Sequence, residues 1–169
     1  FTSFVASGYQ LQQELVSVLI QVLLANSTIT ELVISGTGLT PNHMKELSLK
    51  ISEGCNSISI RSFDLSRNPI EDKGLEYFSE IVGNLGYGLI HLHLSELSFS
   101  KKGALGPLIT NLRENSFSFE TLTSLDLSSN KLDSESSVAL SSWLSHPNCL
   151  STLNLSSTRV MIDKLAGFA

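Results

Sequence analysis

The sequence predicts an α/β fold in which short parallel strands and helices alternate along a right-handed superhelix, with the sheet on the concave side and the helices on the convex side. First, an eleven-residue template, L-x-x-L-x-L-x-x-N-x-L, fits the chain five times. Second, the copies start 31, 29, 33 and 28 residues apart, which leaves room for one strand, one helix and two turns per unit. Third, the segments between the copies carry apolar residues at the three- and four-residue spacing of helices.

The five template copies place strands near residues 31–35, 62–66, 91–95, 124–128 and 152–156. The copies are ITELVISGTGL from Ile29, IRSFDLSRNPI from Ile60, LIHLHLSELSF from Leu89, LTSLDLSSNKL from Leu122 and LSTLNLSSTRV from Leu150. Side chains alternate between the two faces of a strand, so the fourth and sixth template positions point into the core. The expected centre of the core is Leu92, Leu94, Leu125 and Leu127.

The segments between the strands predict helices with recognisable ends. Thr40 and Pro41 place a hydroxyl at the N-cap and a proline at the first helical position. Asp133 is a second N-cap, whereas Gly106 and Pro107 should delay or bend the helix of the third unit. The expected buried faces are Met44, Leu47 and Ile51, then Leu75, Phe78, Ile81, Val82 and Leu85, then Leu108, Ile109 and Leu112, and last Val138, Leu140, Trp143 and Leu144.

Both ends of the chain lie within units of the same kind. Residues 9–24 predict the helix of an earlier repeat that has lost its strand, and residues 161–169 begin a further helix. Solenoids need a polar cap on each terminal unit, and neither end supplies one. We therefore expect residues 1–169 to form a single repeat region of about five repeats that is part of a longer array.

Composition and motifs argue against several classes of function. The net charge is -5 and the basic residues are scattered, so the sequence does not predict the basic surface that nucleic-acid binding requires. The longest apolar run, residues 16–24, is shorter than the roughly 20 residues that cross a membrane. Motifs such as GxSxG, HExxH and a Walker loop are absent, and His43 and His146 read as surface residues, so we expect a non-enzymatic protein without a cofactor. Cys55 and Cys149 lie three repeats apart, too far for a disulfide, and should be free thiols.

The outward-facing strand positions form the candidate protein-binding surface. His93 falls between Asp64 and Asp126 of neighbouring strands, which would favour a charged imidazole and make a contact sensitive to protonation. The expected contact residues are Glu31, Asp64, His91, His93, Asp126 and Asn154. A zinc site is the weaker alternative, because zinc needs three or four ligands and this open surface has no cysteine. A third interpretation is that these are solvated polar residues on a concave sheet, beside a column of serines that form turns.

The ninth template position normally holds an asparagine whose amide bonds the backbone of the turn between units. Asn68 and Asn130 match, and Thr37 and Thr158 are partial substitutes. Leu97 cannot make this bond, so we expect the turn of the third unit to be built differently.

Units of this length with LxLSxN strands and full helices resemble the ribonuclease-inhibitor-like subclass of leucine-rich repeats. Within it, FDLSRNPIEDKGLEYFSEIV and LTSLDLSSNKLDSESSVALSSWLSHPNCLSTLNLSST are similar to the repeats of CARMIL proteins, cytoskeletal linkers that regulate actin capping protein. The resemblance covers Ile29 to Val160. It implies a protein-interaction scaffold in a cytoplasmic regulator of actin capping and filament assembly, associated with the cytoskeleton and the plasma membrane.

The resemblance assigns no contact residue in this chain. The segment of CARMIL proteins that binds capping protein lies outside their repeats, and nothing in this sequence resembles it. Protein partners are therefore implied only as a class, actin-regulatory proteins, and oligomerisation is left to regions outside this chain. Similar stretches occur in innate-immune receptors and in the GTPase activator for Ran. Two alternatives stay open: a ligand-sensing repeat region of a receptor, and a GTPase-activator-type repeat module.

Overall fold

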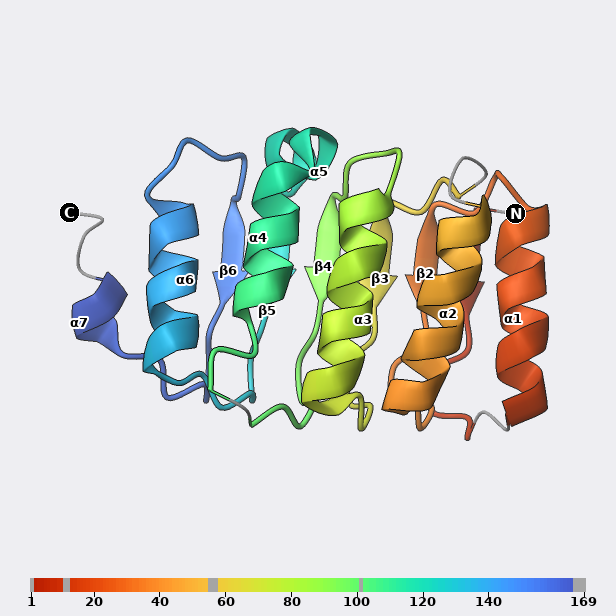
Figure 1. The fold of residues 1–169 in the computed structure, drawn as a ribbon, viewed down its shortest axis with the longest axis horizontal. Coiled ribbons are helices and arrows are strands. Elements are labelled where there is room, and N and C mark those ends of the chain that lie inside the picture. Colours follow the sequence, from red (N-terminus) through yellow and green to blue (C-terminus); the bar gives the residue numbers. More distant parts are fainter. Residues whose placement is uncertain (1, 11–12, 55–57, 101, 166–169) are drawn as a thin grey trace.

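The computed structural model describes residues 2–10, 13–54, 58–100 and 102–165. In these ranges the strands form one parallel sheet in the order of the sequence. The strands are β1 (Ser3–Val5), β2 (Glu31–Val33), β3 (Ser62–Asp64), β4 (His91–His93), β5 (Ser124–Asp126) and β6 (Thr152–Asn154). The helices are α1 (Gln13–Ala25), α2 (Pro41–Gly54), α3 (Glu71–Asn84), α4 (Gly106–Glu114), α5 (Ser116–Thr121), α6 (Ser134–Leu144) and α7 (Ile162–Leu165). Figure 1 shows the helices in one layer in front of the sheet, which is the predicted α/β solenoid.

The inward-facing side chains form a continuous core between the sheet and the helices. The four predicted central residues are fully buried: Leu92, Leu94, Leu125 and Leu127. In the second unit the corresponding position is Phe63, whose ring meets that of Phe78 in α3 edge to face at a centroid distance of 5.3 Å. Each unit thus covers the apolar side of its neighbours, and the stack is held by contacts between units.

The predicted helix starts are confirmed, and so are the predicted buried faces except in α6, where Leu144 is only partly buried. α2 begins at Pro41, α4 begins at Gly106, and the Asp133 side chain accepts the N–H of Ser136 at the start of α6. The prediction for Val138 is wrong, because the buried side of α6 runs through Ser137, Leu140 and Trp143 and leaves Val138 50% exposed. The prediction for His43 is also wrong, because its ring is buried, where Nδ1 accepts the N–H of Thr40.

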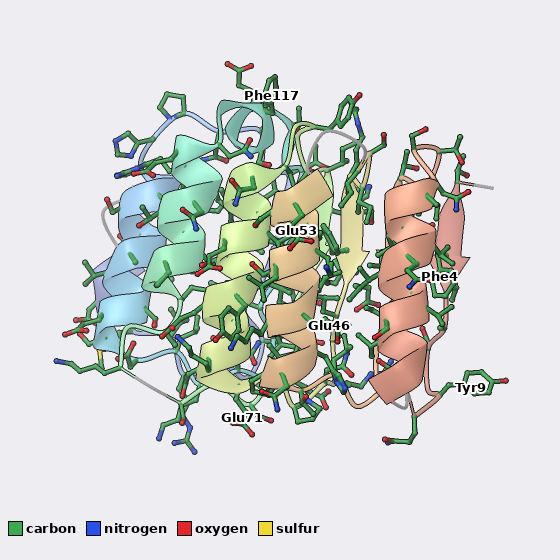
Figure 2. All side chains as sticks on the ribbon, turned by 45° about the vertical axis from the view of Figure 1, so that its right-hand side comes forward. Phe4, Tyr9, Glu46, Glu53, Glu71 and Phe117 are labelled. Carbon is green, nitrogen blue, oxygen red and sulfur yellow. The ribbon has the colours of Figure 1, made fainter. Side chains whose placement is uncertain are left out.

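The prediction that the first helix lacks its strand is wrong. β1 pairs in parallel with β2, and the N–H of Ala6 donates to the carbonyl of Val33. The strand escapes the template because Phe4 and Ala6 stand where leucines are expected. The outer side of this first unit is apolar: Figure 2 shows Phe4 and Tyr9 beside α1, and Tyr9 is 75% exposed. At the other end, the described residues of the expected last helix form α7, and residues 166–169 lie outside the described ranges.

α5 has no counterpart in the sequence prediction. Asn115 separates it from α4, and its side-chain oxygen accepts the N–H of Ser118. The amide of the same residue donates to the carbonyls of Val82 and Leu85 at the end of α3. The extra turn of helix therefore replaces a loop, and Asn115, which precedes it, fastens the third unit to the second. Figure 2 shows Phe117 of α5 projecting from the top of the molecule.

The turns that follow the strands confirm the expectation for the third unit. Leu97 is fully buried, and its N–H donates to the side-chain oxygen of Asn130 in the next unit. Ser98, which follows Leu97, has a φ of 63°, in the left-handed region. Gly38 and Arg159, which follow Thr37 and Thr158 at the same place in their units, also lie in this region. The turn thus differs from those built on asparagine, whereas the register of β3, β4 and β5 is regular.

The concave face as candidate functional site

The outward-facing side chains of the strands surround a shallow hollow of about 520 Å³ on the concave face. Four of the six predicted contact residues line it: Glu31, Asp64, His91 and His93. The other lining residues are Val33, Ser62, Thr123, Ser124, Ser151 and Thr152. The hollow therefore spans β2 to β6, and its lining combines outward-facing strand residues with Thr123 and Ser151, which precede β5 and β6.

Asp126 and Asn154 do not line the hollow, and they bond to each other and to the turns. The amide of Asn154 donates to one carboxylate oxygen of Asp126 at 3.0 Å. The other oxygen of Asp126 accepts the N–H of Ser128 at 2.8 Å. The side-chain oxygen of Asn154 in turn accepts the N–H of Ser156 at 3.1 Å. Both residues are thus part of the frame beside the hollow.

Three strands of this sheet end with an aspartate or asparagine two positions before a serine. Asp64, Asp126 and Asn154 each accept the backbone N–H of the serine two residues later, which is an Asx turn that ends the strand. The spacing D/N-x-S was visible in the sequence and would have shown that these side chains have a structural role. One carboxylate oxygen of Asp64 is used in this way, at 3.0 Å from the N–H of Ser66, and the residue still lines the hollow.

The serine column has the structural role that the turn interpretation assigns to it. The hydroxyl of Ser66 accepts the N–H of Ser95 at 3.2 Å, and the hydroxyl of Ser35 donates to that of Ser7 at 3.1 Å. The backbone carbonyls of the same column continue the ladder beyond the strands, as in the bond from Gly36 to Ser66 at 2.8 Å. Ser7 extends the column into the first unit.

The predicted position of His93 between two aspartates is confirmed. The register pairs His93 with Asp64 on β3 and with Asp126 on β5. Partial burial raises the pKa of Asp126, but hydrogen bonds from Ser128 and Asn154 and the charge of His93 outweigh it and hold this pKa below the ordinary value. The carboxylate of Asp126 is therefore ionised throughout the range in which histidine titrates.

Other features of the described residues bear on the remaining predictions. No group of three or more His, Cys, Asp or Glu side chains that could hold a metal ion occurs among them. None of the helices in the described ranges is long and apolar enough to cross a membrane. Cys149 is an exposed free thiol, and Cys55 lies outside the described residues.

Comparison with known proteins agrees with this architecture. The family model for Leucine Rich repeat matches residues 56–79 and 120–141. Protein CARMIL of Dictyostelium discoideum is 34% identical over 99% of this chain, which spans 16% of that protein. Human capping protein, Arp2/3 and myosin-I linker protein 3 is 32% identical over 99% of this chain, which spans 12% of its length.

Among solved structures, Leiomodin-1 Actin-Binding Site 2 superimposes with a TM-score of 0.64, covering 85% of this chain and 79% of the other at 13% identity. At this identity the likeness concerns the fold alone. The repeated strands, the helix layer and the matched sequences together show that the chain has a leucine-rich repeat fold and that its sequence is similar to that of CARMIL.

Proposed function

We propose that this chain is the leucine-rich repeat scaffold of a regulator of actin capping and filament assembly, and that it binds protein partners through its concave face. The observation that carries the binding site is the set of polar side chains around the hollow. Within the described part of the chain, the side chains of Glu31, His91 and His93 make no hydrogen bond or ion pair. Such side chains on a rigid, regular sheet are available to an incoming partner.

The assignment to actin regulation is supported by the relatives, one of which is named a linker of capping protein, Arp2/3 and myosin-I. Because this chain spans a sixth or less of those proteins, their partners are carried over as candidates only. The proposal includes residues 1–169 as one repeat region, a non-enzymatic role, and a cytoplasmic location at the cytoskeleton and plasma membrane. All six predicted contact residues belong to the proposed surface, with Asp126 and Asn154 as its frame.

Binding of the immobilised chain to purified capping protein, Arp2/3 complex and myosin-I tests this function. We expect at least one of the three to bind, and binding to fall several-fold when Glu31 and His91 are both replaced by alanine. The matched control is replacement of Glu53 and Lys50, an exposed ion pair on α2, by alanine. Absence of binding to all three proteins would refute the actin assignment. Binding that the control abolishes and the concave variant leaves intact would move the site to the helices.

A further inference from the structure

The concave face has a one-sided charge pattern. None of the outward-facing positions of β1 to β6, all of which the structure describes, holds lysine or arginine. Carboxylates stand on β2, β3 and β5, at Glu31, Asp64 and Asp126. Arg61, which precedes β3, does not line the hollow, and its guanidinium lies over the ring of Tyr87 at 5.8 Å from the centroid. The electrostatic potential in the hollow is therefore negative, and carboxylates are its source.

Two of these carboxylates are available to a ligand. Glu31 is exposed and has no hydrogen bond or ion pair in the described ranges. Asp64 uses one oxygen for the N–H of Ser66, and the second oxygen has no partner among the described residues. Asp126, by contrast, has both oxygens bonded, so it adds charge but no open acceptor.

The dimensions of the hollow suit an extended segment of polypeptide. From β2 to β6 there are four strand spacings of about 4.8 Å each, and an extended chain of about six residues covers that length. The rest of the lining consists of Val33 and of serine and threonine residues, whose hydroxyl oxygens can accept a hydrogen bond from a passing backbone N–H.

Building on the proposed function, we propose that the partner segment in this hollow is cationic, with lysine or arginine side chains that pair with Glu31 and Asp64, and that protonation of His91 and His93 weakens its binding. The three carboxylates attract such a segment while the imidazoles are neutral. Protonation of both imidazoles would add two positive charges to the face that carries these three carboxylates, and the net negative charge that attracts the segment would fall. The helices cover the opposite side of the sheet. On the concave side, the register places His93 between the carboxylates of Asp64 and Asp126, and His91 between Ser62 and Ser124.

The direct test is fluorescence anisotropy of the 169-residue chain with a labelled peptide of alternating lysine and glycine, in dilute buffer of low ionic strength. A peptide with glutamate in place of lysine is the control for charge. We expect the lysine peptide to bind and the glutamate peptide not to bind. Asp64→Asn should weaken binding about three-fold, as is typical of an exposed ion pair. Glu53→Gln removes a carboxylate from α2 in the helix layer (Figure 2) and should change nothing.

The histidine component is tested in the same assay at about pH 7.5 and about pH 5.5, on either side of the ordinary histidine pKa of about 6.5. Binding should weaken about ten-fold at the lower pH, and the double variant His91→Gln, His93→Gln should lose this dependence. Unfolding midpoints establish that each variant is folded. Equal binding of both peptides, or equal effects of Asp64→Asn and Glu53→Gln, would refute a cationic partner in the hollow. If the chain captures an actin regulator through its concave face yet ignores the lysine peptide, the proposed function stands and this inference fails.

Discussion

Replacing Asn130 by alanine should lower the free energy of unfolding strongly, because the side chain makes three buried hydrogen bonds to the backbone. The side chain is 2% exposed, and its amide donates to the carbonyls of Leu94 at 2.6 Å and Leu127 at 3.0 Å. Its oxygen accepts the N–H of Leu97 at 2.8 Å. Alanine would leave these three buried backbone groups without their partner. At about 1 kcal/mol for each, the free energy of unfolding should fall by about 3 kcal/mol, and by more if no water enters.

Urea unfolding followed by circular dichroism measures this loss, and two further variants separate its causes. Asn130→Asp keeps the acceptor for Leu97 but removes the donors, so it should cost at least as much as alanine. Asn84→Ala removes an amide that donates to the carbonyl of Glu80 on the exposed surface of α3, and should change stability by less than about 0.5 kcal/mol. A loss below about 1 kcal/mol for Asn130→Ala would refute the reasoning that this residue holds two turns together.

Three other perturbations follow from the packing and the charges. Leu125→Ala should cost about 2 to 5 kcal/mol of unfolding free energy, against less than about 1 for the exposed Leu49→Ala, and equal losses in urea titrations would contradict the assigned core. Gly88→Ala should cost about 1 to 3 kcal/mol because its new Cβ would overlap the backbone of α5, whereas Gly86→Ala meets open space; the thermal midpoints of the two would then differ by several degrees. Partial burial raises the pKa of Asp133, but hydrogen bonds from Ser136 and Gly103 and the charge of Lys102 hold this pKa below the ordinary value. The ionised Asp133 side chain therefore stabilises the fold at pH values above its unfolded pKa of about 3.9. This contribution disappears as the pH falls through the lower native pKa. Asp133→Asn should therefore flatten the loss of stability in acid, and a chain whose acid unfolding is unchanged by it would argue against the linkage.

The units of the solenoid were predictable wherever leucines occupy the inward positions. The five strands, their register and the helix start at Asp133 follow from local pattern, because strand alternation and capping depend on residues close in sequence. β1 was missed because Phe4 and Ala6, which pack partly buried against the core, do not match a leucine template. Val138 was misplaced because the rotation of α6 about its axis is set by the neighbouring unit.

The candidate site was also predictable in part. Periodicity alone placed all six predicted contact residues on the outward side of the strands, and it placed His93 between Asp64 and Asp126. Periodicity could not show that Asp126 and Asn154 bond to each other. Nor could it show which side chains border the hollow, because that depends on distances between units.

The sequence by itself determined that this protein is a stack of strand and helix units, that its leucines form the core and that its polar strand residues share one face. It did so because side-chain alternation and helix periodicity are local properties of the chain. The tertiary structure alone decided that Asn130 bonds the turn at Leu97 and that Asn115 fastens the third unit to the second. It also decided that Glu31, Asp64, His91 and His93 border one hollow. These arrangements join residues of different units, and only the stacking of the units brings them together.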